Sequence, residues 1–375
     1  MINIITRKGV TGLRAVLSAE REDGDHHRVW GRLSGAKQDT DFFISVSHQN
    51  QQGFPLSDDF EPTALQGQGL RENSDRERAN LFANLGYRPN QDWQLGLTFN
   101  HTHGEQGVPP IVIDDNKDPF ASRPRFERVD DLEGYSVQLA ATFDPTVPWA
   151  ARSWLYFNSL DQEENRYDDN QYNTITDRNN FHKENTNRVM GFHVQPSFEF
   201  GPEGLLSVAF DGRRESFDET GFIQTARNRS QPLAQDNEVF VYSAALEYSF
   251  KPLPKLGLIF SYGHHWQARE QGSSDNSNSF ITGAYYDLSP QTRFRASVSR
   301  KVRVPSIRQL YESISGDPNL NFETAYLYEI GARYQFNSAN SVDLVLSYTD
   351  VEDFIEKKPL NGSLRKQPGI PFPGH

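Results

Sequence analysis

Apolar and polar side chains alternate along most of this 375-residue chain. In the segment 324–336, one row contains Tyr326, Tyr328, Ile330, Ala332, Tyr334 and Phe336. The intervening row contains Leu327, Glu329, Gly331, Arg333 and Gln335. The segments 93–101, 135–143, 206–212, 238–250, 256–264 and 294–299 repeat the pattern, and 28–36 shows it less clearly. A period of two indicates strands with one apolar face, so we expect an all-β, antiparallel chain of about fifteen strands.

The length of the apolar rows favours a transmembrane β-barrel. Aromatic residues stand at both ends of the rows, as at Tyr326 and Phe336 or Phe240 and Phe250. Ten steps of about 3.3 Å, tilted by roughly 40°, project to roughly 25 Å, the height of the apolar band of such a barrel. Strands of soluble sandwiches are usually about five or six residues long. A soluble sandwich still produces the same alternation and stays open as an alternative.

The connectors between strands alternate between short and long. Short ones are expected at 36–40, 88–92, 144–151, 201–204, 251–255, 289–291 and 337–341. Long ones are expected at 49–76, 104–132, 161–187, 213–237, 266–278 and 301–323, with a brief exception at 22–26. Outer-membrane barrels have tight turns at one rim and long loops at the other, so this sorting favours a membrane barrel.

Composition narrows the possible functions. The net charge is −12 and no basic stretch is present, so nucleic acid is not an expected partner. The absence of cysteine excludes disulfides, thiolate metal sites and a cysteine nucleophile. No run approaches the roughly 18 apolar residues of a membrane-spanning helix. The first six residues do not resemble a signal peptide, so an exported protein would lack its start here.

Candidate chemistry is sparse. The pairs His26/His27, His101/His103 and His264/His265 are candidate metal ligands, but histidine is also a common residue at the edge of a membrane. The pairs Asp114/Asp115, Glu163/Glu164 and Asp168/Asp169 lack the spacing of a calcium loop and are expected to be solvated or to share divalent ions with lipopolysaccharide. No catalytic or phosphate-binding motif is present, so we predict no enzyme, no metal site and no cofactor.

Cationic and aromatic residues in two expected loops suit an anionic iron chelate. These candidate ligand-binding residues are Arg303, Arg308 and Tyr311 in one loop and Arg123, Arg125 and Phe126 in the other. An ordinary exposed loop would have the same composition.

Three stretches resemble TonB-dependent receptors of the bacterial outer membrane. The run 2–9 (Ile-Asn-Ile-Ile-Thr-Arg-Lys-Gly) is similar to the end of that family's plug domain. The run 303–331 contains Arg-Val-Pro-Ser, Leu-Tyr, Gly-Asp-Pro-Asn-Leu-Asn-Phe-Glu and Tyr-Glu-Ile-Gly, in the order that the family has. Asp317 stands where the family usually has Asn, and Phe322 where it usually has Pro. The run 347–355 is similar to a family strand that ends before an outer loop.

The resemblance implies a barrel of about 22 strands with a plugged lumen, of which about seven strands are absent here. Residues 1–9 would be a remnant of the plug, 10–354 an incomplete transmembrane barrel and 355–375 a truncated outer loop. The motif residues are expected to set loop and strand geometry. They are Pro305, Ser306, Asp317, Pro318, Asn319, Leu320, Glu323, Tyr328, Glu329 and Gly331. Glu329 and Arg333 are expected to point inward and to pair with each other or with groups in the lumen.

The function that the resemblance implies is energised uptake of a scarce nutrient, often an iron–siderophore complex, across the outer membrane of a Gram-negative bacterium. Expected partners are outer-membrane lipid and lipopolysaccharide, a metal chelate or other small nutrient, and the TonB complex only through the missing plug region. The fragment alone is not expected to transport. The alternatives are a passive outer-membrane channel or structural barrel, and a soluble extracellular β-sandwich that binds or hydrolyses carbohydrate.

Overall fold

The computed structural model describes residues 9–115, 117, 123–201, 204–357, 364–367 and 370–372. The strands are β1 (Gly12–Glu22), β2 (His26–Lys37), β3 (Thr40–Gln51), β4 (Arg76–Tyr87), β5 (Trp93–Val108), β6 (Phe126–Phe143), β7 (Trp149–Tyr167), β8 (Phe181–Glu199), β9 (Leu205–Ala226), β10 (Arg229–Leu253), β11 (Leu256–Arg269), β12 (Asp275–Ser289), β13 (Thr292–Arg303), β14 (Glu323–Gln335), β15 (Ser341–Glu352), β16 (Phe354–Lys357), β17 (Leu364–Gln367) and β18 (Ile370–Phe372). Within these ranges the one helix is α1 (Ile307–Tyr311), and no helix is long and apolar enough to cross a membrane.

The strands pair in the order in which they occur in the chain. β1 to β15 follow one another as hydrogen-bonded neighbours, β18 pairs with β15, and β16 pairs with β17 in a separate two-stranded sheet. The pairs from β1 to β5 and from β10 to β15 are antiparallel. The expected all-β, antiparallel chain of about fifteen consecutive strands is therefore confirmed.

The chain divides into two compact units. Unit 1 consists of Met1–Ala140, Leu155–Met190 and Ser216–Asn237, and unit 2 of Ala141–Trp154, Gly191–Glu215 and Glu238–His375. The strands β6 to β10 thus contribute one segment to each unit.

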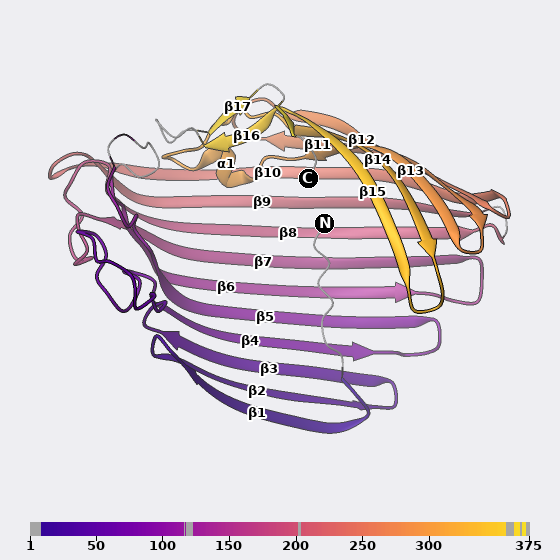
Figure 1. The fold of residues 1–375 in the computed structure, drawn as a ribbon, viewed down its shortest axis with the longest axis horizontal. Coiled ribbons are helices and arrows are strands. Elements are labelled where there is room, and N and C mark those ends of the chain that lie inside the picture. Colours follow the sequence, from indigo (N-terminus) through magenta and orange to yellow (C-terminus); the bar gives the residue numbers. More distant parts are fainter. Residues whose placement is uncertain are drawn as a thin grey trace. The chain divides into compact units, whose positions relative to one another are not determined.

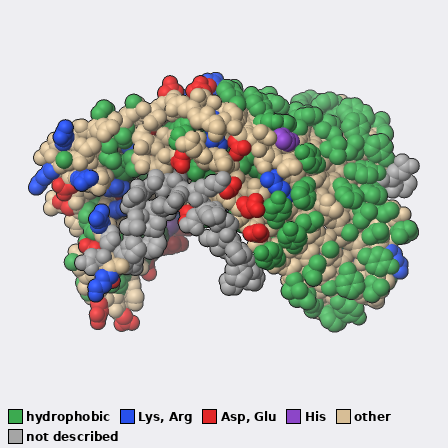
Figure 2. All heavy atoms as spheres, turned by 90° about the horizontal axis from the view of Figure 1, so that it is seen from above, with side chains coloured by type: hydrophobic (Ala, Val, Ile, Leu, Met, Phe, Trp, Pro, Cys, Tyr) green, Lys and Arg blue, Asp and Glu red, His purple; other side chains and the backbone are tan. Residues whose placement is uncertain are grey.

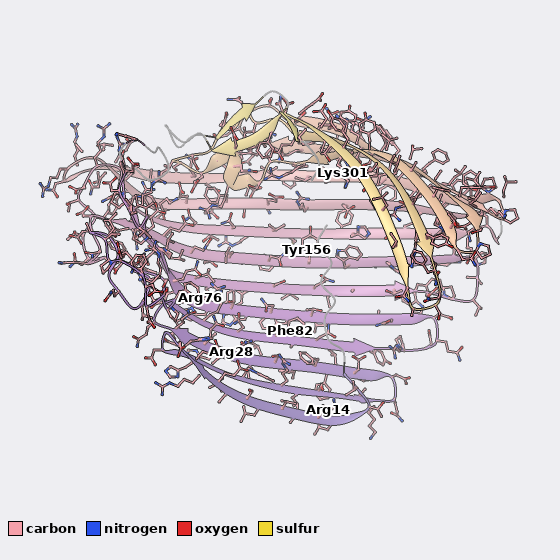
Figure 3. The ribbon with its side chains drawn as sticks, in the orientation of Figure 1. Arg14, Arg28, Arg76, Phe82, Tyr156 and Lys301 are labelled. Atoms are coloured by element: carbon pink, nitrogen blue, oxygen red, sulfur yellow. The ribbon has the colours of Figure 1, made fainter. Side chains whose placement is uncertain are left out.

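In unit 1, β1 to β5 lie side by side (Figure 1). Their side chains form one apolar and one mostly polar face. The pairing register aligns Leu33, Ile44, Ala83 and Phe99 in one row across β2 to β5, and Leu33 and Ile44 are exposed. The opposite face is mostly polar, with Asn84 donating to Thr98 at 3.0 Å. It also carries Phe43 and Phe82, whose rings lie 6.1 Å apart, with Phe82 labelled in Figure 3. Alternation in the sequence therefore corresponds to two chemically different faces of the sheet.

Unit 2 shows the same sorting over β11 to β15. The register aligns Leu258, Ala284, Ala296, Ile330 and Leu346 in one row. Figure 2 shows hydrophobic side chains gathered on this face, and Ile330 and Leu346 are 59% and 60% exposed. The soluble sandwich requires these side chains to be buried against a second sheet, and they are not.

Several strands are longer than the apolar rows indicate. The expected long connector at 213–237 is wrong, because β9 continues to Ala226 and β10 begins at Arg229. The turn between them contains only Arg227 and Asn228, and Asn228 has a φ of +55°. Alternation disappears there because most side chains on both faces are polar, while the backbone ladder continues.

The expected long connector at 266–278 is also wrong, because β11 continues to Arg269 and β12 begins at Asp275, so that only 270–274 connect them. The remaining connectors follow the expected sorting. The loops after β3 and β13 cover 52–75 and 304–322, close to the predicted limits. The loop after β7 is shorter than expected, since β7 ends at Tyr167 and β8 begins at Phe181. Residues 1–8 of the expected plug remnant at 1–9 and much of the expected outer loop at 355–375 lie outside the described residues, so those boundaries stay predictions.

Candidate functional site

The loop between β13 and β14, in unit 2, has a small core of its own. Ser306 caps α1: its side chain accepts a hydrogen bond from the Gln309 backbone N–H, and the Gln309 side chain accepts one from the Ser306 backbone. This reciprocal capping box stabilises a helix that is too short to form in isolation. Buried apolar side chains then hold the loop together; they are Ile307, Leu310, Tyr311, Leu320 and Phe322.

Two buried side chains of β11 bind this loop, and we call their contacts the loop clamp. The Gln267 amide donates to the Pro305 carbonyl at 3.1 Å. The Arg269 guanidinium donates to the Pro318 carbonyl at 3.0 Å and to the Gln267 amide oxygen at 2.7 and 2.9 Å. The two motif prolines therefore expose carbonyl groups that anchor the loop, in agreement with a structural role.

Tyr311 is part of the loop core. Its side chain is 5% exposed, and its hydroxyl donates to the Gln271 carbonyl at 2.6 Å. Burial raises the pKa of the Tyr311 hydroxyl. This placement corrects the expectation that the ring belongs to an exposed ligand surface, because the hydrophobic core of the loop takes it up. Next to it, Gly272 has a φ of +87°, and a Cβ there would lie 2.5 Å from the Pro318 carbonyl oxygen.

The two other candidate cations of this loop have carboxylate partners. Arg303 lies 2.5 Å from Glu323, whose buried carboxylate also accepts a hydrogen bond from the Ile355 backbone. Arg308 lies 3.1 Å from Glu312, one helical turn away. Both positive charges are thus compensated, Arg303 by Glu323 where β13 and β14 meet the loop and Arg308 by Glu312 within it, which weakens their attraction for an anionic ligand.

The Gly-Asp-Pro-Asn turn of the motif is fixed by a local hydrogen bond and by one to α1. The Asp317 carboxylate accepts from the Asn319 backbone N–H at 2.9 Å, and the Asp317 backbone N–H donates to the Gln309 carbonyl at 2.9 Å. Leu320 then enters the loop core. An Asx turn of this kind supports Asp as well as the Asn that the resemblance leads us to expect at this position.

On β14, the motif residues alternate between the two faces. Tyr328 is exposed on the apolar face, and its ring lies 6.3 Å from that of Tyr348. Glu329 lies on the polar face, as does Gly331, where a Cβ would lie 3.0 Å from Arg295 Nε. Gly331 therefore leaves room for the Arg295 side chain.

The polar face of unit 2 contains a cavity of about 710 Å³. Its charged lining residues are Asp287, Arg293, Arg295, Glu329 and Arg333. Arg293 binds Asp287 at 2.6 Å, and Arg295 binds Asp343 at 3.0 Å. Glu329 and Arg333 line the same cavity, as expected of inward residues, but they form no ion pair with each other.

In unit 1, a charged cluster holds the polar ends of the strands. Arg128 donates to Asp75 at 2.7 and 2.9 Å and to Asp130 at 3.1 Å. Asp130 also accepts from Asn165 at 2.7 Å and from the Tyr167 hydroxyl at 2.6 Å. Bidentate and charge-assisted bonds of this kind stabilise the strand extensions that carry no apolar row.

The second predicted ligand loop lies beside this cluster. Arg123 and Arg125 are exposed, and neither guanidinium forms an ion pair within the part of the chain that the structure describes. The Phe126 ring lies 6.1 Å from that of Tyr172, and the Arg128 guanidinium lies 5.7 Å from the Tyr172 ring. Tyr172 was not predicted, because it lies in a polar loop far away in sequence.

Asp168 organises the loop between β7 and β8. It accepts from the backbone and hydroxyl of Thr176 at 2.9 and 2.7 Å, from the Asp177 backbone at 2.8 Å and from Asn180 at 2.7 Å. Burial by itself raises the pKa of this carboxyl, but the donors outweigh burial and hold the pKa of Asp168 well below its usual range. The carboxylate thus serves as an acceptor for its own loop.

The candidate histidines of β5 pair with carboxylates across strands, whereas His265 bonds to the Ser279 hydroxyl at 2.9 Å. His101 lies 3.2 Å from Glu133, and His103 lies 3.6 Å from Asp131. Over the described ranges, no group of three His, Cys, Asp or Glu side chains is arranged to hold a metal ion.

Comparison with known proteins gives a family and a fold. The family model for the "TonB dependent receptor-like, beta-barrel" matches residues 69–367. No curated protein matches the chain. Among solved structures, the copper transporter OprC is similar with a TM-score of 0.72 and 14% identity, over 93% of this chain and 56% of that one.

Two further solved structures are similar. The ferric enterobactin receptor PfeA from Pseudomonas aeruginosa has a TM-score of 0.70 and 12% identity, over 98% of this chain and 60% of its own. The ferric-catecholate import receptor Fiu from K12 E. coli has a TM-score of 0.67 and 12% identity, over 98% and 62%. At these identities the likeness shows the fold alone. This chain spans less than two thirds of each of the three.

We predict that Gln267→Leu releases the loop between β13 and β14. The substitution leaves the Pro305 carbonyl and part of the Arg269 guanidinium buried without their partner, which costs about 2–4 kcal/mol of local stability. Limited proteolysis should therefore cut within 304–322 much faster than in the wild type. Ser274→Ala removes only the hydrogen bond of 3.4 Å to the Arg269 backbone and is the control. Equal cleavage of all three proteins would contradict the clamp.

We predict that the Thr176 and Asp177 amides are protected from hydrogen exchange by Asp168. A lowered carboxyl pKa contributes stability that is present above the unfolded value of about 3.9 and is lost as pH falls through the folded pKa. After correction for intrinsic rates, protection should be the same at pH 5 and pH 7. Asp168→Asn should lose this protection at both pH values. Asp169→Asn should keep it, because the Asp169 carboxylate accepts from the Gln171 backbone and not from Thr176 or Asp177. Loss of protection in the wild type between pH 7 and pH 5 would contradict the assignment.

Proposed function

We infer that this chain, which belongs to the TonB-dependent receptor-like β-barrel family, is the membrane-spanning part of a receptor for nutrient uptake across the outer membrane. The family consists of transporters and receptors. The cellular location, the nutrient and the energy coupling are our proposals for this chain.

The observation that carries the proposal is the apolar face of the sheet. Ile330, Leu344 and Leu346 are each about 60% exposed, although a water-soluble protein rarely exposes a contiguous apolar face of this extent. In hydrocarbon the same face is favourable, since every strand from β2 to β14 has two neighbours that pair its backbone groups. The opposite face carries Glu329, Arg333 and other polar groups suited to an aqueous lumen.

For the substrate we propose a metal chelate of negative charge, with ferric siderophores as the leading class. Arg123 and Arg125 support this choice, because their charges are uncompensated among the described residues and because they directly precede Phe126, whose ring packs against Tyr172. Arg303 and Arg308 are weaker candidates, because each has a carboxylate partner. The structure of PfeA with enterobactin and those of FpvA with ferripyoverdine and related complexes concern chelates of this class, whereas OprC is a copper transporter.

Energised uptake further requires coupling to the TonB complex. We assign this contact to a plug region of the kind that the resemblance at 2–9 implies, and not to the strands. Lipopolysaccharide and lipid would surround the apolar face. A passive channel would need neither plug nor energy.

If the apolar face contacts lipid, arginine should be harmful at one position of β15 and tolerated at the next. Leu346 lies on the apolar face, whereas Ser347 pairs with Glu329 on the polar face. Leu346→Arg should lower the stability of the membrane-inserted protein by about 2–4 kcal/mol and reduce its amount in the outer membrane, and Ser347→Arg should be tolerated. Cell fractionation and detergent extraction measure the amount of each variant in the outer membrane. Normal amounts of the Leu346→Arg protein, or release of the wild type by salt alone, would overturn the placement.

Uptake is tested by deleting the gene and measuring growth on single limiting iron chelates, with and without a functional TonB complex. Growth should fail on one anionic chelate. Arg123→Ala combined with Arg125→Ala should then weaken binding of that chelate by about tenfold or more, because two charge-assisted contacts are lost. Arg227→Ala is the matched control, since Arg227 is an exposed loop arginine that lies 3.8 Å from Asp177. Normal growth of the deletion strain on every chelate would argue against uptake, and TonB-independent growth would indicate a passive channel.

A further inference from the structure

The apolar face of unit 2 is hollowed at its centre. A hollow of about 610 Å³ lies over β11 to β15. Its floor consists of short side chains at the middle of the face, which are Thr282 and Ala284 on β12 and Ala296 and Val298 on β13. The volume lies within the range of about 300–1,000 Å³ that is usual for sites of small molecules.

Large side chains surround this floor. The pairing register places Phe260 and Leu258 beside it on β11, and Tyr328 and Ile330 beside it on β14. Towards the short turns, the next row contains Tyr286 and Phe294, which close that end. Towards the long loops, the next row contains Phe280, Arg300 and Tyr326. The hollow is therefore bounded by aromatic rings on several sides and by a guanidinium at one end.

Arg300 is held at this end by neutral oxygen atoms. Its guanidinium donates to the Tyr326 hydroxyl at 3.2 Å, to Ser277 at 3.1 Å, to the Asn278 side chain at 2.7 Å and to Thr324 at 3.3 Å, and also to the Asn278 carbonyl. These bonds fix its position without neutralising its charge.

No carboxylate compensates Arg300 among the described residues. Asp350 is the acidic residue in the same row, opposite Tyr326 on β15, and thus two strands from Arg300. Adjacent strands are about 4.8 Å apart, so the two residues are separated by roughly 10 Å and form no ion pair. By contrast, the arginines of β13 on the polar face, Arg293 and Arg295, both have carboxylate partners.

We propose that the hollow and Arg300 together bind one phosphate-bearing lipid of the outer leaflet, namely lipopolysaccharide. The phosphate binds the Arg300 guanidinium, and one acyl chain lies over Ala296 and Ala284. Arg300 and Ala296 are four residues apart, or about 13 Å along the strand, so the charge stands at the polar end of a chain-length apolar groove. Arg300 lies at the long-loop end, which faces outward in barrels of this kind. The inference rests on the membrane placement proposed above.

A lipid fits this surface better than a protein partner does. Arg300 is the cation at one end, in the row next to the hollow. Among the described lining residues Glu329 is charged, but it belongs to the opposite face of β14, and the side chains on the apolar face are apolar, aromatic or small. Such a division matches a molecule with one anionic group and a long apolar body. Guanidinium groups also bind phosphate strongly and with fixed geometry.

The test measures lipid retained by the detergent-extracted, delipidated full chain after incubation with purified lipopolysaccharide. The wild type should retain about one molecule, and Arg300→Gln and Ala296→Phe should each retain at least about fivefold less. Arg300→Lys should recover most of the loss. Dephosphorylated lipopolysaccharide should bind the wild type as weakly as the intact lipid binds Arg300→Gln. Inorganic phosphate in millimolar amounts should not displace the lipid.

Two control variants separate the site from general effects. Lys301→Gln removes a cation from the adjacent position on the opposite face of β13, labelled in Figure 3. Ala83→Phe enlarges an alanine of the apolar row on β4, a strand that does not line the hollow. Both should retain lipid as the wild type does, and circular dichroism should show unchanged strand content in every variant that is compared. If Arg300→Gln fails to fold, Ala296→Phe still tests the groove.

The proposal is overturned if all variants retain equal amounts of lipid, if Lys301→Gln loses as much as Arg300→Gln, or if crosslinking places a second copy of the chain over the hollow. A failure of the membrane placement gives a different result. If the protein is not in the membrane, salt alone releases the wild type from the envelope, and this is seen before any lipid is measured.

Discussion

The pairing of backbone groups between neighbouring strands is the interaction on which the rest of this structure depends. A strand has no internal hydrogen bonds, so its N–H and C=O groups must be paired sideways wherever water is excluded. Fifteen consecutive strands satisfy one another in this way. In a paired strand successive side chains point to opposite faces. On β14 this alone places Tyr328 and Ile330 on one face and Glu329 and Gly331 on the other. The apolar face is therefore a consequence of the ladder and the period of the sequence together.

The sequence predicted the strands well where their two faces differ. The segments 93–101 and 324–336 alternate because one face must be apolar, and both are strands. At 213–237 the prediction of a connector was wrong, since β9 and β10 continue there with polar residues on both faces. The alternation of apolar and polar residues depends on the surroundings of the two faces of a strand and not on its backbone hydrogen bonds. The alternation therefore stops where both faces have similar surroundings, although the strand continues. The cluster around Arg128 and Asp130 holds such a region together by charge.

The loops were predicted in part. Pro305 and Pro318 were expected to set loop geometry, but their partners Gln267 and Arg269 lie 38 and 49 residues away, and no local pattern connects them. From the sequence alone, Tyr311 is predicted to be an exposed aromatic residue in a polar loop. A core formed by a single loop shows no regular spacing of apolar residues that would reveal the burial of Tyr311. The sequence did contain a pattern that singles out Arg300, but it was not used in the prediction. Arg300 has the same parity as Phe294, Ala296 and Val298, and an arginine in an apolar row marks either a row end or a site.

The position of Arg300 also indicates where the apolar belt ends. On β14 the exposed row continues from Tyr328 through Ile330 to Tyr334, and Arg300 stands one row beyond Tyr328. A charge inside the belt would cost about 2–4 kcal/mol near its middle and almost nothing at its edge, so the edge is where a lipid-facing arginine is stable. Arginines on the opposite, polar face do not contact lipid and can therefore lie at the height of the apolar belt. Arg293, Arg295 and Arg333 do so. A cation at the edge of the belt, directly above a hollow of small residues, is placed where the phosphate and the chain of one lipid meet.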